Sequence, residues 1–167
     1  TFLAQMNDGR AHTLGVRYYG DLADGSHTFR VRATDAVGNT GPETTHTWIV
    51  DTLAPTVTIT KAPNDPSGVK SATFEFSATE AASFQCELDG NAGACTSPRT
   101  FNNLMDMVHT FKVRATDASG NTGNTATYEW LVETVLPVVT LTATPNQRSN
   151  SSAATFFFTV NKSATLE

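Results

Sequence analysis

Apolar and polar side chains alternate along most of this chain, and the alternation is clearest between residues 55 and 136. In residues 71–79 (SATFEFSAT), Ala72, Phe74, Phe76 and Ala78 fall on one side, with polar residues between them. Successive side chains of a strand point to opposite faces, so a period of two predicts strands with one buried face. No helical stripe of apolar residues competes with this pattern.

Turn residues separate the alternating segments. The turn at Asp89, Gly90 and Asn91 predicts a hairpin between two of them. The expected strands lie in residues 55–63, 71–79, 83–90, a segment through Cys95, 109–117 and 126–134. About seven short strands, with turn signals roughly every 8 to 12 residues, indicate an all-β sandwich.

One phrase of the sequence occurs twice, as HTFRVRATDAVGNTG in residues 27–41 and HTFKVRATDASGNTG in residues 109–123. An offset of 82 residues brings the two copies together, and it also places Trp48 on Trp130 and Pro55 on Pro137 without a gap. The sequence therefore predicts a tandem repeat of 82 residues, with sandwiches arranged as a rod.

The linker prolines Pro55 and Pro137 mark where one repeat ends, because proline cannot donate to a central β-ladder. Residues 55–136 then form a complete repeat, residues 1–54 the C-terminal part of the one before, and residues 137–167 the N-terminal part of the next. A partial sandwich would leave core faces exposed. We expect the chain to be a window of a longer array; the alternative is that partial ends of neighbouring molecules complete each other.

Charge and hydropathy narrow the classes of partner. The formal net charge is -5, and the chain has no basic patch that would release counterions from phosphates. This excludes nucleic acid and anionic membranes as expected partners. No apolar run approaches the roughly 18 to 20 residues that span a bilayer, so no membrane insertion is expected in this segment.

The two cysteines, Cys86 and Cys95, flank the predicted hairpin turn. This spacing favours a disulfide across the hairpin, with free thiols as the alternative, and a metal site would want more Cys or His nearby. A disulfide favours an oxidising location, extracellular or periplasmic.

The motifs FxCxLDG, VRATDxxGNT and W-x-V-D/E-T before proline together resemble the tandem Ig-like repeats of large bacterial surface proteins. These repeats are similar in fold to fibronectin type III modules. The resemblance covers the whole chain and implies an exported, multidomain stalk, adhesin or fibre without catalytic residues. Ala4 and Thr13 stand at the cysteine positions of the first repeat, so the disulfide would not be present in every repeat.

The repeated phrase contains a turn between two strands. Asp can accept backbone N–H bonds there, while Gly and Asn tolerate positive φ, so a purely structural role explains these residues. The structural turn residues are Asp35, Gly38, Asn39, Asp117, Gly120 and Asn121.

A calcium site is the sharper hypothesis for the same turn, because Asp and Asn supply hard oxygen ligands. In an Ig-like sandwich this loop, the linker and the loop after the second strand share one end. The expected ligands at that domain junction are Asp51, Glu80, Asp117 and Asn121. At the next junction Glu133 and Lys162 stand in the places of Asp51 and Glu80, and we expect them to pair as ions instead. No cofactor is expected apart from calcium at this junction.

Catalysis is not expected. His27 and His109 have no cluster of metal ligands beside them, so packing or hydrogen bonding explains them better. Trp48 and Trp130 fit a sandwich core better than a sugar platform. No G-x-S-x-G motif, phosphate loop or C-x-x-C motif is present.

The predicted function is structural: an extracellular or cell-surface array of Ig-like domains that forms a stalk, adhesin shaft or fibre. Its expected partners are neighbouring Ig-like domains, with a cell-surface or carbohydrate ligand at a distal tip. The alternatives are a module that binds carbohydrate or protein, and a filament subunit that polymerises by strand complementation between chains.

Overall fold

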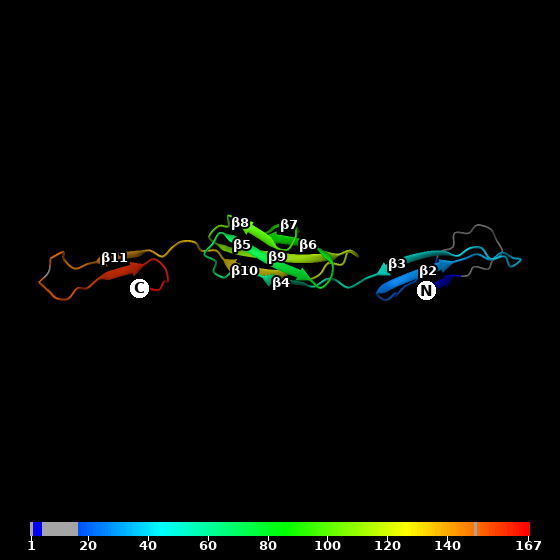
Figure 1. Cartoon of the computed structure of the whole chain (residues 1–167), viewed down its shortest axis with the longest axis horizontal. Coiled ribbons are helices and arrows are strands. Elements are labelled where there is room, and N and C mark those ends of the chain that lie inside the picture. The colour runs from blue at the N-terminus through cyan, green and yellow to red at the C-terminus, as the bar shows by residue number, and fades with distance from the viewer. Residues whose placement is uncertain (1, 5–16, 149) are drawn as a thin grey trace.

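The regular structure of this protein is β-strand, as the alternation of the sequence predicts (Figure 1). The structure is a computed structural model that describes residues 2–4, 17–148 and 150–167. Helices are absent from these described residues, and no helix in them is long and apolar enough to cross a membrane.

The central strands form two antiparallel sheets between residues 57 and 131. One sheet has the order β10-β9-β6-β7, and the other has the order β4-β5-β8. The strands are β4 (Val57–Lys61), β5 (Ser71–Ala78), β6 (Ala82–Leu88), β7 (Asn91–Cys95), β8 (Arg99–Asn102), β9 (Val108–Asp117) and β10 (Ala126–Leu131).

Residues of both central sheets contribute to one buried hydrophobic cluster. Ala72, Phe74 and Phe76 alternate into the core from β5, and the Phe74 ring stacks on Phe111 of β9 with centroids 4.0 Å apart. Each fully buried Phe contributes about 1.5–3 kcal/mol by leaving water. The buried hydrophobic residues are Val57, Ala72, Phe74, Phe76, Cys86, Leu104, Phe111, Val113, Ala115, Trp130 and Val132.

The predicted hairpin joins β6 and β7. Asp89 and Gly90 both have positive φ, at 49° and 85°, which is the backbone that a two-residue turn between twisted strands requires. Cys86 and Cys95 are joined by a disulfide across this hairpin. The described residues contain no free cysteine.

The sequence pattern did not predict β8. This short strand pairs antiparallel with β5, with Ala72 opposite Phe101, and Phe101 packs its edge on Phe74 with ring centroids 6.3 Å apart. Four residues with a single apolar side chain give too little alternation for detection.

The flanking segments repeat parts of the central fold. Strands β2 (Gly25–Val31) and β3 (Thr44–Val50) pair His27 with Trp48, as β9 and β10 pair His109 with Trp130. Strands β11 (Val139–Ala143) and β12 (Phe157–Val160) correspond to β4 and β5. Strand β1 (Phe2–Ala4) pairs parallel with β2, although its counterpart β6 pairs antiparallel with β9. Figure 1 shows β2–β3 and β11 on opposite sides of the central strands.

Candidate functional site: the linker and its junctions

The repeated phrase closes a turn by hydrogen bonds to an aspartate. Asp117 Oδ1 accepts the backbone N–H groups of Ser119 and Asn121 at 2.8 and 2.9 Å, and its Oδ2 accepts the Asn121 amide at 2.9 Å. Gly120 supplies the positive φ, at 93°. The turn is therefore held by its own residues.

The first copy of the phrase has the same arrangement. Asp35 Oδ1 accepts the N–H groups of Val37 and Asn39 at 3.0 and 2.8 Å, and Oδ2 accepts the Asn39 amide at 2.8 Å. Gly38 repeats the φ of 93°. Because both copies form the same bonds, the structural role alone explains why these residues recur.

Hydrogen bonds to the carboxylates lower the pKa of both turn aspartates. For Asp117, burial acts to raise the pKa, and the bonds from the Asn121 side chain and backbone outweigh it. For Asp35, the bond from the Asn39 side chain is the largest cause. The charged form of each aspartate is thus the form that holds the turn.

The turn of the central repeat also holds the preceding linker. The Asn121 amide donates to the carbonyl oxygen of Asp51 at 2.9 Å, and the Ser119 hydroxyl donates to Asp51 Oδ2 at 3.3 Å. These contacts cross 70 and 68 residues of sequence. The repeated phrase therefore binds the linker that precedes its own sequence repeat.

The linker proline Pro55 packs against the end of the repeated phrase, at Gly123. Pro55 is fully buried, and a Cβ at Gly123 would lie 1.6 Å from its carbonyl oxygen. Next to it, the Asn124 side chain accepts from the backbone N–H of Val57 at 3.1 Å, at the start of β4. Glycine at 123 is what lets the linker approach. Pro137, the other linker proline, is exposed.

Three carboxylates gather where the linker meets the central repeat. Oxygen atoms of Asp51, Glu80 and Asp117 all lie within 4.8 Å of one another. Such a set carries enough negative charge to attract a divalent cation, although exposed carboxylates also cluster without one. The structure thus brings together the three acidic residues of the hypothesised calcium site.

Asn121 lies beside these carboxylates but faces them with its donor group. Its amide nitrogen serves two acceptors, the Asp51 carbonyl and Asp117 Oδ2, so the amide oxygen does not take the place expected of a calcium ligand. In this arrangement Asn121 is a linker anchor.

The second junction is built differently. Lys162 Nζ lies 2.8 Å from Glu133 Oε1 and also donates to the carbonyl oxygen of Val135. These residues stand one repeat after Glu80 and Asp51, and their pairing agrees with the charge swap in the sequence. The carboxylate cluster is therefore a feature of the first junction.

A second anchor, which the sequence analysis missed, ties each linker to the repeat before it. Asp24 Oδ1 accepts the backbone N–H and the hydroxyl of Thr52 at 3.1 and 2.9 Å. Asp106 makes the same pair of contacts with Thr134. The signal in the sequence was the match of both residues at an offset of 82, because Asp24 falls on Asp106 and Thr52 on Thr134.

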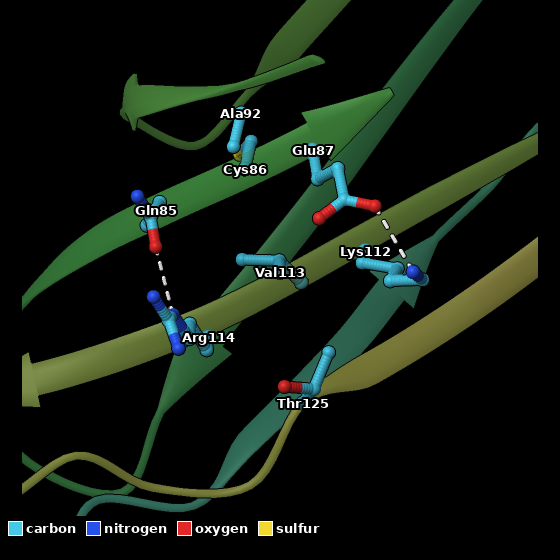
Figure 2. A pocket seen from close by; sticks show the side chains of 8 residues that line it. All are labelled: Gln85, Cys86, Glu87, Ala92, Lys112, Val113, Arg114 and Thr125. Atoms are coloured by element: carbon cyan, nitrogen blue, oxygen red, sulfur yellow. Dashed lines mark hydrogen bonds and ion pairs between the residues drawn. The ribbon is translucent and has the colours of Figure 1, made fainter. Parts of the chain in front are cut away.

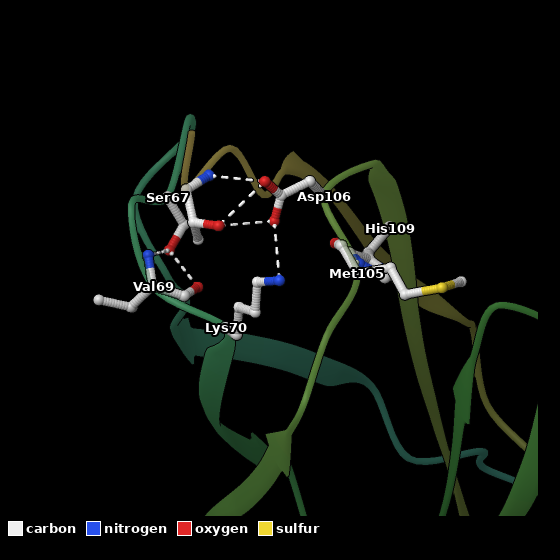
Figure 3. A network of polar contacts seen from close by, with 7 residues as sticks. Ser67, Val69, Lys70, Met105, Asp106 and His109 are labelled. Atoms are coloured by element: carbon white, nitrogen blue, oxygen red, sulfur yellow. Dashed lines mark hydrogen bonds and ion pairs between the residues drawn. The ribbon is translucent and has the colours of Figure 1, made fainter. Parts of the chain in front are cut away.

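Lys70 supports the second of these anchors. Its ammonium group lies 3.6 Å from Asp106 Oδ1, as Figure 3 shows. The backbone N–H and hydroxyl of Thr134 are the largest causes that lower the pKa of Asp106, and the Lys70 charge adds to them. The anchor is therefore a charged carboxylate at neutral pH.

The buried His109, near the start of β9, contacts an acceptor with each of its two ring nitrogens. Its Nδ1 lies 2.7 Å from Asp89 Oδ2, and its Nε2 lies 2.9 Å from the carbonyl oxygen of Met105. Both partners are acceptors, so both contacts are hydrogen bonds only when the ring carries two protons. Burial acts to lower the pKa of His109, but the bonds to Asp89 and Met105 and the Asp89 charge raise it overall.

The outer face of the four-stranded sheet has a shallow cavity of about 310 Å³. Figure 2 shows two cross-strand pairs on it: Lys112 Nζ lies 2.9 Å from Glu87 Oε1, and Arg114 Nε donates to Gln85 at 2.8 Å. Arg114 thus pairs with the glutamine two residues before Glu87 on the same strand. These four polar side chains are thus paired with one another across the strands.

Comparisons with known proteins add no family to this description. No family model matches the chain, and no curated protein matches it with significance.

Proposed function

We propose that this chain is a non-catalytic structural array of Ig-like β-sandwiches, arranged as a rod and serving as an extracellular stalk, adhesin shaft or surface fibre. The observation that carries the proposal is the linker at residues 51–55. It is bound to the preceding repeat through Asp24 and Thr52, and to the following repeat through Asn121 and Gly123. A linker held on both sides transmits force and direction between domains.

The central sheets support the proposed sandwich. Phe74 of one sheet contacts Phe111 and Trp130 of the other, with ring centroids 4.0 and 5.2 Å apart. The repetition of strand pairing at β2–β3 and β9–β10 supports the proposed tandem units. Residues 1–54, 55–136 and 137–167 are then the three parts of the array.

The proposed location is outside the cell. The disulfide between Cys86 and Cys95 supports an oxidising compartment. It clamps the β6–β7 hairpin, which suits a domain that bears load. The histidine with the best-defined surroundings, His109, engages acceptors at both ring nitrogens, so it is not poised for proton transfer to a substrate.

A calcium ion at the first junction is a second proposal, favoured by the three carboxylates of Asp51, Glu80 and Asp117. A bound divalent cation would offset their mutual repulsion and stiffen the joint between the linker and the central repeat. The Glu133–Lys162 pair at the second junction joins opposite charges without a metal ion.

Single-molecule stretching of the full chain tests the structural function. We expect residues 55–136 to unfold in one discrete step, because their two sheets share one core. Reducing the disulfide should lengthen that step by about 25 Å, since nine residues at roughly 3.3–3.6 Å each replace a Cα–Cα distance of 5.8 Å. Gradual extension without a step would contradict a load-bearing role.

A further inference from the structure

A short segment between β8 and β9, residues 103–107, contacts the chain where it leaves the central repeat, and we call this segment the strap. The carbonyl oxygen of Met107 accepts the backbone N–H of Val132 at 2.9 Å. Asp106 accepts the backbone N–H and the hydroxyl of Thr134 at 3.1 and 2.9 Å. The strap therefore anchors the second linker, residues 133–137, where that linker begins.

A buried histidine also holds the strap. His109 Nε2 lies 2.9 Å from the carbonyl oxygen of Met105, the residue next to Asp106, and Figure 3 shows these residues together. His109 is 3% exposed, and its ring packs on Trp130 with centroids 5.4 Å apart. A buried ring that loses a hydrogen-bond partner cannot take water in its place unless the residues around it move.

Asp89 is the charged group that contacts the His109 ring. Its Oδ2 lies 2.7 Å from Nδ1, and its Oδ1 accepts the backbone N–H of Thr110 at 2.9 Å, so the carboxylate is held in place. Charged groups on the other elements around the ring have partners of their own: Asp106 pairs with Lys70 and Thr134, Glu129 with Thr110, and Asp65 with the backbone N–H of Leu131.

Loss of one proton from His109 breaks the contact with the strap. The remaining proton stays on Nδ1, because a hydrogen bond to the Asp89 carboxylate is stronger than one to a neutral carbonyl. Nε2 then turns a lone pair toward the Met105 carbonyl oxygen, and two acceptors 2.9 Å apart form no hydrogen bond. The strap must move away from the ring to relieve this contact.

We infer that His109 is a pH-sensitive latch, whose doubly protonated form holds the strap and Asp106 against the second linker and whose neutral form releases them. The pKa of His109 is raised above 6.5 in the folded protein, so the latch is closed at pH 6.5 and opens as pH rises through the folded-state pKa. The inference rests on the proposed structural function, and it makes the stiffness of the second junction depend on pH.

The first repeat has the same strap geometry without the charged partner in its sequence. His27 Nε2 lies 2.7 Å from the carbonyl oxygen of Ala23, and the next residue, Asp24, binds Thr52. At an offset of 82 residues, Asn7 stands in the place of Asp89. The inference therefore concerns the second junction.

Amide hydrogen exchange, measured by NMR in the 167-residue chain, tests the latch. The readout is the protection of the Thr134 amide, which donates to Asp106, after each rate is divided by the intrinsic rate at the same pH. From pH 6.5 upward, protection should fall about tenfold as His109 loses its proton, which is the change expected for one lost hydrogen bond. The midpoint of this fall should equal that of the His109 imidazole, titrated in the same sample.

Asp89→Asn is the decisive variant, because asparagine tolerates the positive φ of 49° at this position. Its amide group can donate to Nδ1 of His109, which places the single proton of the neutral ring on Nε2, where it donates to Met105. The Thr134 amide should then stay protected at high pH, although His109 itself titrates at a lower pH than in the wild type.

Lys70→Gln is the matched control. It removes the charge 3.6 Å from Asp106 Oδ1 and leaves the contacts of the His109 ring in place. The midpoint of the Thr134 transition should therefore equal that of the wild type. A midpoint that moves in Lys70→Gln while the His109 titration stays unchanged would contradict the latch.

Thr134 protection that stays constant while His109 titrates in the wild type would overturn the inference. Release of Thr134 at the midpoint of His109 in Asp89→Asn would overturn it as well. Either result, in a chain whose central repeat still unfolds in one step under force, would remove the latch and leave the proposed structural function standing. Gradual extension under force would count against the structural function itself.

Discussion

Gly123 lies against the carbonyl of Pro55 so closely that a methyl group at 123 would stand 1.6 Å from the Pro55 oxygen. The repeated phrase and the linker that precedes its domain are therefore fitted to each other. The equivalent glycine of the first copy, Gly41, would place its Cβ 3.7 Å from the Ala33 carbonyl, which is ordinary contact. The space around residue 123 thus requires glycine, whereas the space around residue 41 admits a Cβ.

Gly123→Ala should displace the linker and destabilise the central repeat by about 1–3 kcal/mol, the usual cost of forcing extra atoms into a packed site. Gly41→Ala is the matched control and should change the free energy of unfolding by far less. Chemical denaturation followed by tryptophan fluorescence measures both. Equal effects of the two substitutions would show that the linker does not dock on Gly123.

His109 should make stability depend on pH. Because its folded-state pKa is raised above the unfolded value of 6.5, its contribution is fully present below about 6.5 and is lost as pH rises through the folded pKa. An NMR titration of the imidazole nitrogens should show both protonated at pH 6.5. Asp89→Asn should lower the His109 pKa, and a His109 that titrates below 6.5 in the wild type would contradict this account.

Asp106 should also make stability depend on pH, but its contribution should be lost at low pH and not at high pH. Its folded-state pKa lies below 3.8, so its contribution is present above that value and is lost as pH falls through the folded pKa. Asp106→Ala should lower the melting temperature at neutral pH, since Thr134 loses its acceptor. The difference from wild type should shrink as pH falls below 3.8, through the folded-state pKa. A difference that is independent of pH would mean that the substitution acts through packing alone.

Removal of the Cys86–Cys95 bridge should destabilise the central repeat by about 2–3 kcal/mol, because the bridge closes only a short loop in the unfolded chain. Thermal unfolding with and without reductant measures the change. The double variant Cys86→Ala, Cys95→Ala should unfold like the reduced wild type and should not respond to reductant. If reductant leaves the thermal unfolding of the wild type unchanged, opening the Cys86–Cys95 loop gives the unfolded chain no added entropy.

Calcium should raise the melting temperature if it binds the first junction, by the amount that ligand binding to the folded state alone confers. Asp51→Asn should abolish the effect, because it removes one of the three carboxylates. Glu133→Gln, at the junction with the Lys162 ion pair, should preserve it. Identical melting in calcium and in a chelator at matched ionic strength would show that the carboxylates hold no calcium.

Much of the fold follows from local pattern. The alternation around Phe74 and Phe111 depends only on neighbouring residues, and the Asp89–Gly90 turn has backbone requirements that few residues meet. These features predicted the main strands and the hairpin. The short strand β8 was not predicted, because its position is set by pairing with β5. This pairing joins residues far apart in the sequence, such as Thr73 and Thr100, which are 27 residues apart.

The sequence predicted which acidic residues meet at the first junction, but it did not predict all the hydrogen bonds that they form there. Fold geometry placed Asp51, Glu80 and Asp117 together, and the Lys162 swap indicated an ion pair at the next junction. The direction in which the Asn121 amide points depends on which acceptors surround it, and sequence does not reveal them. The Asp24–Thr52 anchor joins residues 28 apart, and only comparison of the repeats signals it.

The most direct test of a linker that fixes neighbouring domains is the distance distribution between spin labels at Thr45 and Thr127. These exposed positions are equivalent in β3 and β10, on either side of the linker. The account predicts one narrow distribution, which should broaden when a Gly-Ser insertion after Thr52 is combined with Asn121→Ala, because neither Pro55 nor Asp51 then ties the linker to the following repeat. A wild-type distribution as broad as that of the insertion variant would contradict the claim that this chain is a stiff structural array.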